Sequence, residues 1–409
     1  MTTSAKVILM LVTVLVSLAC GHESDGPSPP AALRILLNPV DVETAPCGSA
    51  TFEVVAQGQP PLAYQWFRGG VPILGANSPT LTIERAWSGS AADAFSVSVT
   101  SAGGTVLSED AHLHVVETGD PIEFAEVRVF GEMAVEGADV YWTDGSSVNA
   151  AKSDCSDHFR RIYDRVEPGE NTYALALTPS RVVWSDQALG AVRSAEKGGG
   201  APLLIASGLG GGTPYLLIAN GETIIWPSVV AGLQMVPSFG GTTTTLGDAA
   251  PVFAGDITSD RGFLYWTDLQ SGTVKRMPLG GGAITILAEG QSYPNAILVD
   301  DRYVYWTTAI NWDSDAPAGF LNRMTKDGTS QVVLATRPSA IMQLAADATH
   351  VYASASAQVP GSGHVFKVAI DGSESPNILA SGLDLPFDVA VDTTFLYWAD
   401  QRAIWRMPK

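Results

Sequence analysis

A short aromatic motif that recurs along the chain constrains the fold more than any other feature of the sequence. Its clearest copy is FLYWTD, from Phe263 to Asp268, and related copies lie on both sides of it at steps of 40 to 47 residues. The tyrosine, tryptophan and aspartate positions that repeat are Tyr141, Trp142, Asp144, Trp184, Asp186, Trp226, Tyr265, Trp266, Asp268, Tyr305, Trp306, Tyr397, Trp398 and Asp400. A period of this length, with several short strand-like segments per repeat, predicts a β-propeller in which each repeat forms one blade.

The number of blades depends on how the weaker copies of the motif are interpreted. The segments 225–228 (IWPS) and 352–355 (YASA) are degenerate, or worn, copies that lack some of the motif residues, and counting both gives seven blades. If one of them were a loop, the ring would have six. Seven is favoured because the last repeat ends at Lys409 after its third strand and needs an outer partner. The segment 121–129, which precedes the first repeat, has no other partner and is predicted to close the last blade.

The repeats from Asp120 to Lys409 resemble the YWTD propellers of the low-density lipoprotein receptor family. The likeness rests on the motif, on prolines that lead into innermost strands, such as Pro294 and Pro386, and on Asp-Gly turns such as Asp327-Gly328. It implies that the repeated tyrosines and tryptophans pack between blades and that the repeated aspartates hold neighbouring backbone. These residues would then be structural. The family has six blades, so a seventh copy of the motif is a departure from it.

The segment 33–117 shows short alternating apolar and polar runs at spacings typical of a β-sandwich. It resembles the immunoglobulin-like domains of bacterial surface proteins, with Trp66 as the buried tryptophan of the third strand. Val54 and Val97 stand at the family's two disulfide positions. We therefore expect an all-β protein, with an immunoglobulin-like sandwich at 33–117 followed by a propeller at 121–409.

The start of the chain indicates export. Lys6 precedes an apolar run from Val7 to Leu18, which predicts a signal peptide over residues 1–19. The segment Ser17-Leu18-Ala19-Cys20 resembles a bacterial lipobox, which would make Cys20 the lipidated first residue and 20–32 a flexible tether. Gly21 in place of aspartate points, by resemblance to Gram-negative sorting rules, to the outer membrane. Plain secretion is the alternative.

The two remaining cysteines, Cys47 and Cys155, fall in different predicted domains and in no Cys-x-x-Cys spacing. We expect no structural disulfide between them and no metal site. The sequence does not decide whether they are free thiols.

Charge and composition limit the range of partners. The net charge is −19, which repels nucleic acid and anionic membrane surfaces, so membrane contact is expected through the lipid only. We expect a monomer whose ligand is an unknown protein, peptide or glycan, and we expect no cofactor.

Two adjacent repeats carry extra length between their second and third strands, at 309–319 and 356–364. Such insertions on one face can form the wall of a pocket. The residues proposed here as ligand-binding are Asn311, Trp312, Asp313, Asp315 and His364. The acidic positions alternate as in calcium loops but lack the required glycine and distal glutamate. If the side chain of Trp312 is exposed, it offers a surface on which a sugar or peptide could stack. If it is buried against the adjacent blade, its role is packing alone.

Two classes of function remain open. The first is a non-enzymatic binding or scaffolding module that uses the propeller face, and it predicts aromatic and polar residues at the axis. The second is a propeller enzyme, a lyase or hydrolase of the streptogramin-lyase or lactonase kind, and it predicts histidine and carboxylates that converge at the channel mouth around a divalent ion. No catalytic motif is visible in the sequence.

Overall fold

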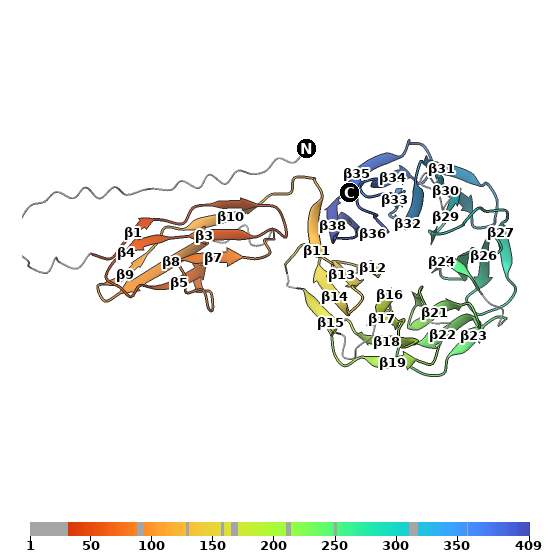
Figure 1. The fold of residues 1–409 in the computed structure, drawn as a ribbon, viewed down its shortest axis with the longest axis horizontal. Coiled ribbons are helices and arrows are strands. Elements are labelled where there is room, and N and C mark those ends of the chain that lie inside the picture. The colour runs from red at the N-terminus through yellow and green to blue at the C-terminus, as the bar shows by residue number, and fades with distance from the viewer. Residues whose placement is uncertain are drawn as a thin grey trace, which may run out of the picture.

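The computed structural model describes residues 32–87, 94–127, 131–156, 159–164, 171–209, 214–248, 252–310, 318–357 and 359–409. All the regular elements in these ranges are β-strands, which confirms the all-β prediction. The strands form two bodies, an elongated N-terminal unit and a ring of sheets (Figure 1).

The N-terminal unit packs short sheets around one apolar core. Its main sheet has the order β2-β10-β8-β5-β6, with β9 beside β8, and two further pairs, β1-β4 and β3-β7, complete it. Trp66 is fully buried and its indole N–H donates to the carbonyl of Ser78 at 2.8 Å. Val54 and Val97 are buried in the same core, where apolar contact replaces a cross-link. The strands are β1 (Arg34–Leu37), β2 (Val42–Thr44), β3 (Ala50–Glu53), β4 (Val55–Gln57), β5 (Ala63–Arg68), β6 (Val71–Pro72), β7 (Thr80–Ile83), β8 (Ala94–Ser101), β9 (Gly104–Leu107) and β10 (Ala111–Val115).

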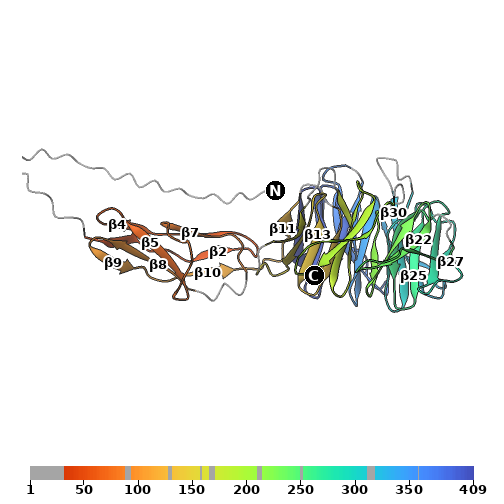
Figure 2. The same cartoon turned by 90° about the horizontal axis from the view of Figure 1, so that it is seen from below.

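The described part of the ring contains seven four-stranded antiparallel sheets, whose innermost strands surround a common axis (Figure 1). Seen from its edge in Figure 2, the ring has two faces between which the strands run. Six of the sheets follow the chain from the inner to the outer strand. They are β12 (Met133–Glu136) to β15 (Arg160–Asp164), β16 (Thr172–Leu177) to β19 (Leu203–Ala206), β20 (Ile218–Asn220) to β23 (Thr244–Leu246), β24 (Ala254–Ser259) to β27 (Thr285–Ala288), β28 (Ile297–Val299) to β31 (Val332–Arg337), and β32 (Ala340–Ala346) to β35 (Asn377–Leu383). Between these ends lie β13 (Asp139–Thr143), β14 (Ser147–Lys152), β17 (Arg181–Asp186), β18 (Ala191–Glu196), β21 (Thr223–Ser228), β22 (Gly232–Pro237), β25 (Phe263–Asp268), β26 (Thr273–Pro278), β29 (Tyr303–Ile310), β30 (Ala318–Thr325), β33 (His350–Ser356) and β34 (Gly363–Ala369).

The remaining sheet joins the two ends of the ring. Strands β36 (Asp388–Val391), β37 (Phe395–Ala399) and β38 (Ala403–Pro408) come from the end of the chain, and β11 (Ile122–Glu126) pairs antiparallel with β38 as the outer strand. This confirms the predicted closure by the segment that precedes the first repeat. Phe124 of β11 packs edge-on against Trp142 and Tyr397, so the closing strand also contributes to the core.

The repeated aromatic residues lie on the second strand of each sheet, and each of those predicted is at most 3% exposed. The hydroxyl of Tyr265 donates to Asp260 at 2.9 Å, and the same pair recurs as Tyr305–Asp300 and Tyr397–Asp392. These aspartates also accept backbone N–H groups of the turn between the first two strands. In these sheets the motif tyrosine therefore holds the hairpin between the first two strands.

The repeated aspartates lie at the other end of the second strand, in the turn to the third. Asp268 accepts the backbone N–H groups of Gln270 and Ser271 at 3.1 and 2.9 Å, and Asp400 accepts those of Arg402 and Ala403 at 2.9 and 3.1 Å. Asp144 accepts the N–H groups of Ser146 and Ser147 in the same way, whereas Asp186 accepts one from its own turn, at Leu189, and one from Asn171, which precedes the inner strand.

The two worn copies of the motif also fold into sheets. The IWPS copy lies in β21 and the YASA copy in β33, each within a complete four-stranded sheet. Ser228 replaces the turn aspartate in the first, and its hydroxyl accepts the N–H groups of Val230 and Ala231 at 3.3 and 3.2 Å. Local hydrogen bonding of the turn thus survives the loss of the motif residue.

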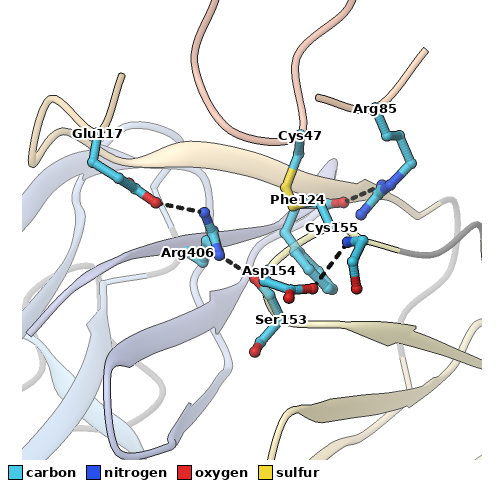
Figure 3. Close-up of a disulfide and its surroundings, with 9 residues drawn as sticks. Cys47, Arg85, Glu117, Phe124, Ser153, Asp154, Cys155 and Arg406 are labelled. Carbon is cyan, nitrogen blue, oxygen red and sulfur yellow. Dashed lines mark hydrogen bonds and ion pairs between the residues drawn. A yellow bond between two sulfur atoms is a disulfide. The ribbon is translucent and has the colours of Figure 1, made fainter. Parts of the chain in front are cut away.

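The expectation of no disulfide is wrong, because Cys47 and Cys155 are bonded with their Cα atoms 5.3 Å apart (Figure 3). Cys47 lies in the turn between β2 and β3, and Cys155 in the connection between β14 and β15. These two segments face one another where the N-terminal unit meets the ring. Because the cysteines are 108 residues apart in sequence, the sequence alone did not indicate that they meet. Nearby, Arg406 of β38 bonds Glu117 at 3.0 Å.

Candidate functional site

The axis of the ring opens on one face into a cavity of about 400 Å³. Ala254, at the start of the inner strand β24, pairs with Asp268, at the end of the second strand β25. Inner strands therefore begin on the face of the ring where second strands end. The cavity lies on this face, which is also the face of the two insertions. The cavity is lined by segments that lead into or begin the inner strands of six of the sheets. Its lining residues are Gly131, Glu132, Tyr173, Tyr215, Leu216, Asn295, Met342, Gln343, Phe387 and Asp388.

Acidic side chains link neighbouring inner strands at this level of the axis. Asp388 accepts the N–H of Met133, in the next sheet, at 2.8 Å and that of its own neighbour Val389 at 2.7 Å. Asp256 repeats the arrangement with Ile297 at 3.0 Å and with the residue that follows it at 2.7 Å. Each carboxyl group therefore ties its own sheet to the next.

Glu132 belongs to the same set, because it accepts the N–H of Leu175 on the next inner strand at 2.6 Å. The three acids act on one another across the axis: Asp256 and Asp388 both raise the pKa of Glu132, and Asp256 raises that of Asp388.

Burial, which disfavours the charged form of a carboxyl group, is the largest cause of their pKa shifts. It raises the pKa of Asp256 and of Asp388 to about 7 and places that of Glu132 well above its usual range. The backbone N–H groups pull the pKa of each acid down, but less strongly. These carboxyl groups consequently hold protons at a pH where surface carboxylates are fully charged, and a cation placed among them would favour their ionisation.

Aromatic side chains surround the acidic centre. Tyr173 and Tyr215 are 40% and 36% exposed, and Phe387 completes the rim. The hydroxyl of Tyr215 donates to the carbonyl of Ala254 at 3.2 Å, which fixes the ring beside the inner strand of the next sheet. Aromatic faces beside carboxylates attract ammonium and guanidinium groups. The cavity is therefore suited chemically to an organic cation.

Amide side chains complete the wall. The side-chain N–H of Asn295 donates to the carbonyl of Met342 at 3.1 Å, and the side-chain oxygen of Gln343 accepts the N–H of Leu344 at 3.0 Å. Asn295 therefore bonds the adjacent inner strand as the acids do, whereas the Gln343 side chain bonds within its own strand.

Of the residues predicted to bind a ligand, only His364 lies in the described part of the chain. It is 9% exposed on β34, and it is not among the lining residues of the axial cavity. Burial, together with the nearby Arg337, lowers its pKa. Asn311, Trp312, Asp313 and Asp315 lie outside the described residues, as does Cys20.

The axial acids were not predicted from the sequence, because each comes from a different repeat. One signal was present: Glu132, Asp256 and Asp388 each directly precede the inner-strand residue that pairs with the motif tryptophan, whereas two other repeats have alanine at the corresponding place, in Ala174-Leu175 and Ala296-Ile297. An acid at a position where sister repeats carry a small apolar residue has no role in packing, and this marks it as a candidate.

Among the described residues, no group of three or more histidine, cysteine, aspartate or glutamate side chains is arranged to hold a metal ion. The same part of the chain contains no helix of the length and apolar character needed to cross a bilayer.

Comparison with known proteins gives a fold and no family. No protein-family model matches the chain, and no curated protein matches it. Among solved structures, it is similar to YCF48 bound to the D1 peptide, with a TM-score of 0.56 at 10% identity over 71% of this chain and 96% of that one. It is also similar to BamB from Moraxella catarrhalis, with a TM-score of 0.46 at 10% identity over 70% of this chain and 96% of that one. The likeness to YCF48 identifies the ring as a β-propeller.

Proposed function

We propose that this protein is a non-enzymatic binding or scaffolding module of the bacterial cell envelope that takes its ligand at the axial mouth of a seven-bladed, YWTD-like propeller. Each four-stranded sheet of the ring is then one blade, and the N-terminal unit is an immunoglobulin-like spacer. The repeated motif, the strand closure and the buried Trp66 support this assignment.

The observation that carries the proposal is the presence of Glu132 and Asp388 in the lining of an axial cavity that Tyr173 and Tyr215 also line, with Asp256 near enough to raise the pKa of both acids. Carboxylates and aromatic faces together recognise a basic side chain. The favoured ligand is therefore a peptide or protein segment that presents a lysine or arginine. YCF48, which is similar in fold, was solved with a bound peptide, and this is a precedent for such a ligand.

Binding of a lysine-containing peptide is expected to tighten as the pH rises from about 6 to about 8. Asp256 and Asp388, with pKa values raised to about 7, lose their protons over this range, so the cavity gains the charge that attracts the cation. Asp388→Asn should weaken binding about tenfold or more, since a hydrogen bond to a charged group contributes about 1.5–3 kcal/mol. Calorimetric titration at several pH values measures both effects.

The matched control is Asp301→Asn, which removes an exposed carboxylate from the hairpin turn between β28 and β29 on the opposite face. Its affinity should equal that of the unaltered protein. Equal losses in the two variants would mean that overall charge attracts the peptide, and binding that weakens with rising pH would exclude the axial carboxyl groups as its receptor.

We further propose that the protein is held at the membrane through a lipid on Cys20 and released from the signal peptide at that residue, with the outer membrane as its destination. Cys20→Ala is expected to move the protein from the membrane fraction to the soluble fraction, because the lipid is its only membrane contact. Fractionation with immunoblotting measures this. Retention of the variant in membranes would contradict the anchor.

A second function is favoured by one observation, the pKa of about 7 for Asp256 and Asp388, which suits a general acid or base. A hydrolase or lyase acting on a small molecule or glycan would use these residues. It ranks second because the described residues that line the cavity bring no histidine and no activated nucleophile to them. Recovery of a bound ligand chemically unchanged after long incubation with the protein would reject it.

A further inference from the structure

A second group of polar side chains lies between two sheets, outside the axial cavity. Arg337 ends β31, the outer strand of one sheet, and Ser339 lies in the short connection to β32 of the next. His364 reaches the same interface from β34, because it and Arg337 both contact the ring of Phe366. Since Arg337 pairs with Gly319 at the start of β30, the group lies toward the face that carries the axial cavity.

The guanidinium group of Arg337 lies against the ring of Phe366, but two of its nitrogen atoms have no hydrogen-bond acceptor among the described residues. Its Cζ atom lies 4.4 Å from the centroid of the Phe366 ring. Nε and Nη2 are both buried, and neither has an acceptor in the part of the chain that the structure describes. These two atoms form one edge of the guanidinium, with the spacing that lets a single carboxylate or phosphate accept two parallel hydrogen bonds.

Two more buried groups at this interface lack partners. Nε2 of His364 and Oγ of Ser339 make no hydrogen bond to any described residue, although the side chains are only 9% and 3% exposed. Unpaired buried polar groups are rare in native proteins because each costs the full penalty of desolvation. Arg337 and His364 contact the same aromatic ring, and Ser339 lies two residues along the chain from Arg337, so the unpaired groups of these residues indicate a missing acceptor.

Other arginines of the ring have acceptors for their terminal N–H groups, although the Nε atoms of Arg276 and Arg406 are also buried without one in the described ranges. Arg276 donates to the carbonyl of Lys326 in the next sheet, and Arg406 pairs with Glu117 at 3.0 Å. Arg337, in contrast, forms no ion pair with a described residue, and burial alone lowers its pKa.

We propose that Arg337, Ser339 and His364 form a binding site for a carboxylate group of a ligand. One guanidinium with an uncharged imidazole and a hydroxyl offers a single positive charge, which matches a monoanion. A phosphate dianion would be only half neutralised, and a buried excess charge is costly. The carboxylate accepts both hydrogen bonds from the guanidinium edge, and the neighbouring side chains donate to its remaining lone pairs.

Thermal unfolding in acetate tests the site on the full-length protein. At matched ionic strength, acetate should raise the unfolding midpoint by about 2–4 °C relative to chloride, because a ligand that binds only the folded state stabilises it. Arg337→Met should abolish this difference. Arg302→Met, which removes an exposed arginine on the opposite face, should preserve it. An equal response to acetate in all three proteins, or a larger response to phosphate than to acetate, would overturn the proposal.

Two further measurements keep the proposal testable if Arg337→Met does not fold. The imidazole NMR signals of His364, assigned by their loss in His364→Gln, should shift as acetate is added to the unaltered protein; signals that stay constant would overturn it. The variant Asp313→Asn/Asp315→Asn should respond to acetate as the unaltered protein does. A response confined to that variant would assign the carboxylate to the chain itself and exclude an external ligand.

Discussion

Replacing Phe124 by alanine is expected to lower the free energy of unfolding by about 3–5 kcal/mol, the range for a buried phenylalanine that leaves a cavity. Phe124 is 1% exposed and packs edge-on against Trp142 and Tyr397, with ring centroids 6.3 and 5.9 Å apart. These partners belong to the first and last sheets in sequence, so one side chain joins the two ends of the ring. Urea unfolding followed by tryptophan fluorescence measures the loss.

The control for this prediction is Phe239→Ala. Phe239 is 57% exposed and contacts chiefly the guanidinium of Arg181, with Cζ 5.5 Å from the ring centroid. Its loss should cost about 1 kcal/mol or less. If the two variants were equally stable, the closing strand would contribute no more to the ring than an exposed contact does.

Loss of the disulfide is expected to cost about 4–5 kcal/mol by the loop-entropy relation, since the bond closes a segment of 108 residues. Cys47→Ser/Cys155→Ser should therefore unfold at a lower temperature than the unaltered protein. The bond also holds the N-terminal unit against the ring, where Arg85 donates to the carbonyl of Phe124 at 3.2 Å (Figure 3). The variant should consequently show faster hydrogen exchange in β11.

Scanning calorimetry with and without reductant separates the disulfide from other effects of the substitution. Reductant should lower the unfolding midpoint of the unaltered protein to that of the double variant and leave the variant itself unchanged. Midpoints that coincide in all four samples would show that the bond does not stabilise the fold.

Periodicity made much of the ring predictable. Four repeats bury a tyrosine–tryptophan pair on the second strand, and the other three bury one aromatic residue of the pair, so the spacing of Tyr265-Trp266 and its sister copies follows the spacing of the sheets. The closing strand was predictable because an unpaired outer position and an unpaired segment can satisfy one another. Both arguments need only local patterns and the rule that backbone groups in a sheet are paired.

The disulfide and the axial cavity depend on information that local patterns do not contain. Cys47 and Cys155 meet only because the N-terminal unit lies against the ring at the closing strand. Glu132, Asp256 and Asp388 come from three different repeats and converge because their strands are all innermost. His364 comes from the predicted insertion at 356–364, and it lies at a separate interface between sheets and not in the axial cavity.

Site-specific photocrosslinking tests most directly whether ligands bind at the axial mouth. A photoreactive phenylalanine analogue is placed at Tyr215, on the rim of the cavity, and in a second protein at Thr349, an exposed residue on the opposite face. A lysine-containing peptide should crosslink from position 215 and not from position 349, and Asp388→Asn should reduce the yield. Crosslinking from position 349 alone, or an equal yield from both faces, would contradict an axial binding site.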